Sequence, residues 1–141
     1  MKLADVKQLW WVSRHRLDAA AQDLAVADAR HEAAQQALAS HRKAMMSELA
    51  RSSQPGMWLG LACWYPAAEN RLDDLEAVAG RLAGEADMAR EMLGAAMKEA
   101  ERFRTVTAEL VAERRAEASK REQEQLDESA LRRTFDRADR S

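Results

Sequence analysis

Residues that are mostly large and apolar recur every seven positions in two separate stretches of this chain, and that repeat limits the fold more than any other feature. The two sets of positions are Leu3, Trp10, Leu17, Leu24, His31, Leu38 and Met45, and then Leu75, Leu82, Ala89, Ala96, Phe103 and Leu110. Such a repeat places one stripe along an α-helix and is typical of coiled coils. Because Pro55 and Gly56 interrupt the chain between the stripes, the sequence predicts a helical hairpin.

A reversal near residue 60 sets an expected register for the two helices. The large positions then pair as Met45 with Leu75, Leu38 with Leu82, His31 with Ala89, Leu24 with Ala96, Leu17 with Phe103, and Trp10 with Leu110. Smaller layers alternate with them: Ala34 with Ala86, Ala27 with Leu93, Ala20 with Ala100, and Ser13 with Thr107. Small residues at such layers allow two helices to pack closely.

The fold class expected is all-α: a long antiparallel two-helix coiled-coil hairpin with an aromatic-rich turn and an overhanging charged C-terminal helix. We expect residues 1–141 to form a single domain. Its predicted parts are a first helix over about 3–50, a turn over about 51–66, a paired second helix over about 67–112 and an overhang over 113–141. Pro66 is placed in the first turn of the second helix, where proline is tolerated.

Composition favours protein partners over nucleic acid or lipid. The formal net charge is −2, so no basic field attracts nucleic acid or anionic membranes. The longest apolar run, residues 57–65, is far shorter than the roughly 20 residues that span a bilayer, so no direct membrane insertion is expected. The single cysteine, Cys63, is compatible with a reducing compartment, and the chain is predicted to be cytoplasmic.

The sequence gives no support for catalysis. His15, His31 and His41 are not spaced to share one helix face, so no metal site is expected. Asp73 and Asp74 lie on an exposed helix, and no glycine-rich phosphate loop is present. We therefore expect no enzyme activity, no catalytic or metal-binding residue and no cofactor. His31 lies on the seam, where a polar residue weakens packing but favours one register.

Two clusters of apolar residues are candidate contact surfaces. The tip cluster includes Met57, Trp58, Leu61, Trp64 and Tyr65. It either folds back as a short third element over Met45 and Met46 or forms an exposed aromatic patch for a partner.

The second cluster lies at the chain ends. Near the start it includes Leu3, Val6 and Trp11, with Trp11 off the seam and therefore the better candidate for an external contact. Near the other end, Leu126, Leu131 and Phe135 interrupt a polar segment, and Leu131 and Phe135 share one helix face.

These features together resemble the FliJ/SctO (YscO-like) family, the central stalk proteins of flagellar and virulence type III secretion systems. The resemblance rests on a helical hairpin that begins almost at residue 1, an aromatic-containing turn and an over-long charged second helix. The local motif is Gln125-Leu126-Asp127-Glu128 followed by Leu131-Arg132-Arg133. The resemblance covers essentially the whole chain.

The resemblance implies a non-enzymatic stalk that couples the hexameric export ATPase to the export gate at the cytoplasmic face of the inner membrane. The end bearing both termini would enter the ATPase ring through Leu126, Leu131 and Phe135. The tip, with Trp64, Tyr65, Leu72 and Leu75, would face the cytoplasmic domain of the gate. Secretion chaperones are further possible partners, and the virulence system is slightly preferred over the flagellar one.

Two other functional classes remain open at this point. One is a cytosolic coiled-coil chaperone or escort that binds secretion partners through its aromatic tip. The other is a scaffold that associates with itself through Trp11 and the tip. A stalk needs the charged overhang, an escort needs the tip, and a scaffold needs concentration-dependent self-association.

Overall fold

The chain folds into two α-helices joined by a short turn. The computed structural model describes residues 2–56 and 58–140; within them α1 spans Leu3–Arg51 and α2 spans Trp58–Arg140. No strand occurs in these ranges, so the all-α hairpin predicted from the heptad repeat is confirmed. The chain divides into two compact units, His15–Met97 and Met1–Arg14 with Lys98–Ser141.

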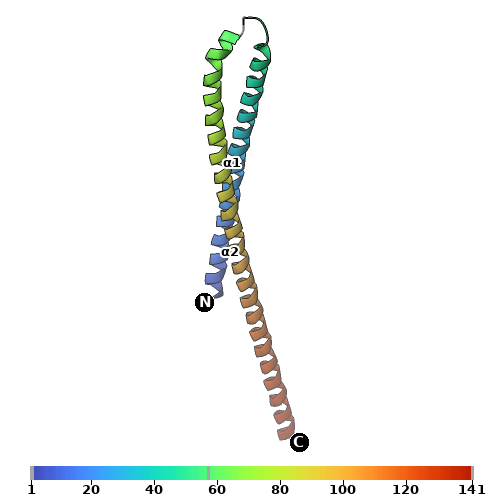
Figure 1. The fold of residues 1–141 in the computed structure, drawn as a ribbon. Helices are drawn as coiled ribbons and strands as arrows, with labels where there is room; N and C mark the ends of the chain where they lie inside the picture. Colours follow the sequence, from blue (N-terminus) through green and yellow to red (C-terminus); the bar gives the residue numbers. More distant parts are fainter. Residues whose placement is uncertain (1, 57, 141) are drawn as a thin grey trace. The chain divides into compact units, whose positions relative to one another are not determined.

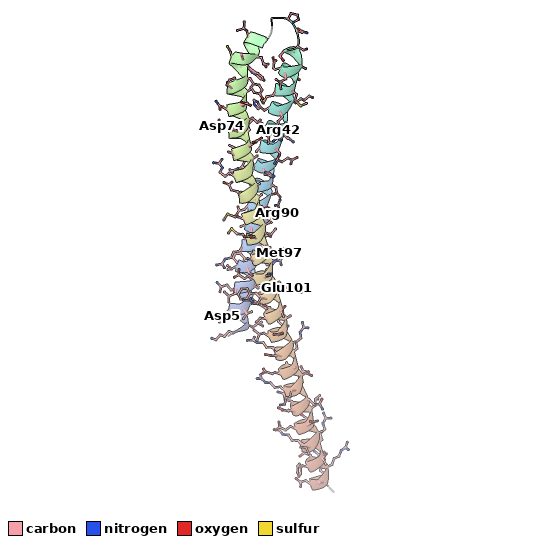
Figure 2. The ribbon with its side chains drawn as sticks, viewed as in Figure 1. Asp5, Arg42, Asp74, Arg90, Met97 and Glu101 are labelled. Atoms are coloured by element: carbon pink, nitrogen blue, oxygen red, sulfur yellow. The ribbon has the colours of Figure 1, made fainter. Side chains whose placement is uncertain are left out.

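In the unit His15–Met97, α1 and α2 lie side by side and run antiparallel, with the turn at one end (Figure 1). Two salt bridges connect the helices in this unit. Arg42 pairs with Glu76 at 3.0 Å, and Arg90 pairs with Asp28 at 2.9 Å; both arginines are labelled in Figure 2. All four side chains are about half exposed, so these pairs contribute little to stability and chiefly flank the apolar seam.

The turn is much shorter than the 51–66 segment that the sequence predicted. α1 ends at Arg51, and serine hydroxyls satisfy carbonyls of its last turn: Ser52 donates to Leu49 O, and Ser53 donates to Ala50 O at 2.8 Å. Gly56 has φ of 85°, a left-handed conformation that favours glycine. Met57 lies outside the described residues, and α2 already begins at Trp58.

Pro66 therefore lies inside α2 and not in its first turn, and the expected start near residue 67 was wrong. Proline inside a helix removes one backbone hydrogen bond and costs about 3 kcal/mol. Packing offsets this cost, because residues on both sides of Pro66 continue the helical stripe toward α1. Leu61, Tyr65 and Leu72 are half-buried, and Ala68 is 5% exposed.

The predicted seam is the apolar face that both helices bury. Every position of the two seven-residue stripes and of the small layers between them is buried or half-buried. The most buried members are Val6, Ser13, Leu38, Met45, Ala68, Ala79, Ala86, Ala100 and Thr107. The stripe ends at the half-buried Val111, and residues 112–140 are all exposed although they remain helical.

The register within His15–Met97 differs from the predicted one by about one heptad. His41 Nε2 lies 2.8 Å from the carbonyl oxygen of Ala68, so the ring nitrogen carries the proton that it donates. Pairing Met45 with Leu75 would separate these residues by about 16 Å along the helix axis, beyond the reach of an imidazole. Pairing Met45 with Ala68 brings them within reach, and both of those residues are buried.

Burial in the other unit agrees with the shifted register. Val6 is 1% exposed and would face Arg114, which is exposed, in the predicted register. A one-heptad shift places it opposite Thr107, which is 7% exposed. The shift has a simple cause: because the turn is short, α2 begins at Trp58 and its stripe reaches α1 earlier in the chain.

The buried hydroxyls of this unit are satisfied within their own helices. Ser13 donates to Trp10 O at 2.7 Å, and Thr107 donates to Phe103 O at 2.7 Å. A buried hydroxyl without a partner is costly, so these bonds let two small polar residues occupy seam positions. Both layers remain narrow enough for close helix approach.

Engineered disulfides should report the register directly. In a Cys63→Ala background, we expect Met45→Cys with Ala68→Cys to form an intramolecular disulfide readily, because facing seam positions have the close Cβ atoms that the bond requires. Met45→Cys with Leu75→Cys is the matched control and should cross-link poorly. Non-reducing electrophoresis and mass spectrometry distinguish the two, and preferential cross-linking of the control pair would contradict the shifted register.

His31 is the weak position of the seam. Its ring is half-buried, and Nδ1 is buried with no hydrogen-bond partner among the described residues. A buried polar atom left unpaired costs about 1–3 kcal/mol.

Replacing His31 by leucine should therefore stabilise the hairpin by about 1–2 kcal/mol. Thermal and urea denaturation followed by circular dichroism measure the effect. Gln35→Leu is the control at an exposed position of the same helix and should change stability little. Equal melting of His31→Leu and the parent would show that the imidazole is better accommodated than its geometry indicates.

Candidate partner-binding surfaces

The predicted tip residues lie in the first turns of α2 and not in the turn itself. Met57 is outside the described residues, and of Trp58 only the backbone is described, as the first residue of α2. Leu61, Tyr65 and Leu72 are half-buried on the seam stripe, so they pack against α1. Trp64 is also half-buried but lies beside the stripe, which leaves it as the aromatic side chain best placed for an external contact.

The tip matches neither of the two alternatives left open by the sequence in full. Since α2 is continuous from Trp58, the described residues contain no third element that folds back over Met45. Seam packing nevertheless covers part of the apolar cluster. Leu59 is 62% exposed and Cys63 is exposed, so another part of the cluster remains open to solvent.

An open groove of about 340 Å³ lies at the tip. It is formed by the end of α1, the turn and the start of α2, and its lining residues are Glu48, Arg51, Ser52, Gly56, Gly60, Leu61 and Trp64. Glu48 and Arg51 form a salt bridge at 3.2 Å on the α1 side. Leu61 and Trp64 supply the apolar wall, so the groove suits an apolar side chain flanked by polar groups.

Tyr65 interacts with Glu69 one helical turn later. A hydrogen bond to the Glu69 carboxylate, followed by the negative charge of that carboxylate, raises the pKa of Tyr65 above its ordinary value. This interaction lies within α2, at the residue that follows the groove residue Trp64 in sequence. It constrains a residue that sequence reasoning had assigned to partner contact.

The surface predicted near the chain start is divided between packing and exposure. Val6 is 1% exposed and Leu3 is half-buried, so both belong to the seam and Val6 offers no external contact. Trp11 is 63% exposed, as expected for a residue off the stripe. The guanidinium carbon of Arg14 lies 5.7 Å from the centre of the Trp10 ring, which covers that seam residue.

The predicted contact residues near the end of α2 are strongly exposed apolar side chains. Leu126 is 65% exposed, Leu131 is 60% exposed and Phe135 is 70% exposed. A salt bridge between Arg132 and Glu128 at 2.9 Å stabilises the helix between them. Large side chains exposed to this degree on one short helical stretch are typical of a contact surface.

One surface was missed by sequence reasoning. Residues from both helices form a second open groove of about 230 Å³, lined by Ala20, Asp23, Glu85, Met88, Ala89 and Met92. Met88 and Met92 are 64% and 65% exposed. The sequence signal that could have identified this groove is the pair Met88 and Met92, two large apolar residues at i, i+4 spacing that lie beside the seam and not on it.

The described residues do not form a metal site. Within residues 2–56 and 58–140, no group of three or more His, Cys, Asp and Glu side chains could hold a metal ion. The same residues contain no helix long and apolar enough to cross a membrane.

Comparison with known proteins leaves the family of this chain open. No family model, curated protein or solved structure matches it. Functional inference therefore rests on the residues and on the geometry described above.

Removing the carboxylate of Glu69 should lower the pKa of Tyr65 toward its ordinary value of 10.0. Tyr65 is the single tyrosine of the chain, so the ultraviolet absorbance of its phenolate can be titrated without interference from another tyrosine. The bond exists while the phenol is protonated and is lost as pH rises through that pKa. We expect a lower midpoint for Glu69→Ala and no change for Glu91→Ala; identical midpoints for both variants would contradict the interaction.

Proposed function

We propose that this chain is a non-enzymatic central stalk of a type III protein secretion system, coupling a hexameric export ATPase to the export gate. The observation that carries the proposal is the C-terminal part of α2. Residues 112–140 stay helical while every one of them is exposed, and three large apolar side chains interrupt the charged surface. A charged helical arm of this kind acts as the overhang, with Leu126, Leu131 and Phe135 as its contacts inside the ring.

The hairpin itself suits a transmitting element. Its buried residues form one seam between two helices, and paired helices of this kind resist bending better than a single helix does. Within each compact unit, movement imposed on one helix is passed to the other through the packed layers. The proposal needs no bound cofactor or catalytic group on this chain.

The tip is the proposed contact for the cytoplasmic domain of the export gate. Trp64 and Leu61 line the tip groove, and the Glu48–Arg51 pair provides polar groups beside them. Apolar anchors with a polar rim are the usual composition of a protein–protein contact. Because Tyr65 and Leu72 pack on the seam, we assign them to supporting Trp64.

The ATP hydrolysis rate of the export ATPase from the same genome tests the proposal. We expect full-length protein to stimulate hydrolysis or ring assembly, and a version that ends at Ala112 to lose this effect while keeping its helical hairpin. The truncation leaves the seam intact, since the described residues beyond 112 are all exposed. Circular dichroism of the truncated chain controls for folding.

The outcomes separate this function from the escort alternative. Stimulation that requires residues 113–141 supports the stalk and locates its working end. Absence of any effect by the full-length chain would contradict the stalk. In that case, loss of binding to secretion partners in Trp64→Ala, compared with Trp11→Ala, would assign the chain to the escort class.

A further inference from the structure

Residues 59–65 at the start of α2, which we call the tip strap, pack loosely against α1 next to the turn (Figure 1). The best covered side chains of this described segment are half-buried, and none is buried. On the α1 side and in the turn, none of the described residues 46–56 is buried either. The last buried layer of the seam at this end is Met45 with Ala68, which are 7% and 5% exposed. Close packing therefore stops just beyond the strap.

Polar contacts between the helices stop at the same level. His41 Nε2 lies 2.8 Å from the carbonyl oxygen of Ala68, and the salt bridge between Arg42 and Glu76 lies on the same side of Pro66 as that contact. Among the described residues, no hydrogen bond or salt bridge joins α1 to the tip strap. The contacts of the strap with α1 are therefore apolar and incompletely covered.

Pro66 interrupts the backbone hydrogen bonds of α2 at this boundary. Proline has no N–H, so the helical bond to the carbonyl oxygen of Ala62 cannot form. Helices bend most readily at interior prolines. At its other end the strap follows a turn in which Gly56 has φ of 85°. A helical segment this short is marginal without packing, and it has a pivot on each side.

One side-chain bond crosses the proline. The phenol of Tyr65, the last residue of the strap, donates a hydrogen bond to the carboxylate of Glu69, which lies beyond Pro66. Because both residues belong to α2, this bond restrains bending at Pro66 but does not attach the strap to α1. Its loss is expected to free the strap, just as a restored backbone bond at residue 66 is expected to hold it.

We propose that the tip strap is a hinged element, which swings away from α1 between pivots at Gly56 and Pro66 while the helices stay paired from Met45 and Ala68 onward. Loose packing, missing polar links and a broken backbone ladder coincide in this segment, and segments of this kind open locally at low free energy. Opening widens the tip groove, because three of its lining residues belong to the strap and the others to the end of α1 and the turn.

The hinge controls what the tip presents to a partner. Leu61 and Tyr65 are half-buried when the strap lies on α1, and opening uncovers both side chains. A partner that inserts an apolar residue into the widened groove binds the open form. Its apparent affinity is reduced by the fraction of chains that are open. The hinge goes beyond the stalk function and does not depend on it.

Thiol labelling of the full-length chain tests the hinge without any partner. In a Cys63→Ala background, Leu61→Cys reports opening. Leu75→Cys is the matched control, because both leucines are half-buried at equivalent positions of the seven-residue repeat. We expect a maleimide reagent to label Leu61→Cys about tenfold faster than Leu75→Cys. Equal labelling rates would overturn the proposal.

Two further substitutions should change the labelling of Leu61→Cys in opposite directions. Pro66→Ala should slow it several-fold, because alanine supplies the missing N–H of the helix. Glu69→Ala should accelerate it, because the bond across the proline is lost. Labelling that responds to neither change would assign the exposure of the tip to ordinary fraying of a helix end and overturn the hinge.

Controls for these two variants lie further along α2. Gly84→Ala replaces an interior helical glycine whose added Cβ would meet nothing within 4 Å, so it raises helix stability away from the hinge. Glu91→Ala removes an exposed carboxylate there. Both should leave the labelling of Leu61→Cys as it is, and circular dichroism confirms that each variant remains helical.

Distances between spin labels measure the motion directly. In the Cys63→Ala background, labels at the exposed positions Met46→Cys and Ala62→Cys should give two distances, and Pro66→Ala should reduce the population of the longer one. Lys43→Cys with Asp74→Cys, also exposed, is the control pair and should give one distance. A single distance for the first pair would overturn the proposal. Neither outcome bears on stimulation of the ATPase.

Discussion

The packed seam between α1 and α2 is the constraint on which the rest of the structure depends. Two helices offer each other only one face, so the chain buries a single stripe of residues and leaves the other faces to solvent. Alanine and other small residues occupy many layers of that stripe, and they let the backbones approach closely. The same seam explains why a proline is tolerated inside α2. Packing of Leu61, Tyr65 and Ala68 against α1 outweighs the backbone hydrogen bond lost at Pro66.

Because the seam absorbs most apolar residues, those left exposed stand out as candidates for function. Besides the half-buried Trp64 near the turn, they include Met88 and Met92 at their groove and Leu131 and Phe135 near the end of α2. None of these positions is needed for the two helices to pair. The stalk proposal uses the first and the last.

Much of the fold could be predicted from the heptad repeat, and the main errors came from one residue. Pro66 suggested that the second helix begins after it, so the repeat was not continued back from Leu75 through Ala68 to Leu61. That omission lengthened the expected turn and displaced the register by one heptad. Among the candidate contacts, the exposure of Trp11 followed from its position off the stripe, and that of Leu126, Leu131 and Phe135 from their place beyond the paired segment, whereas Val6 belongs to the seam. The Met88–Met92 groove was missed because its floor includes Ala20, which is distant in sequence.

The sequence by itself determined that this chain forms two helices and which face of each is buried. Both properties follow from a local period of seven residues, which is visible without knowledge of the partner helix. Only the tertiary structure decided which layers meet and where the turn lies. A heptad pattern looks the same after a shift of seven residues, so it leaves several registers nearly equivalent. The short turn at Gly56 and the contact of His41 with Ala68 select among them, and the position of every groove between the helices follows from that selection.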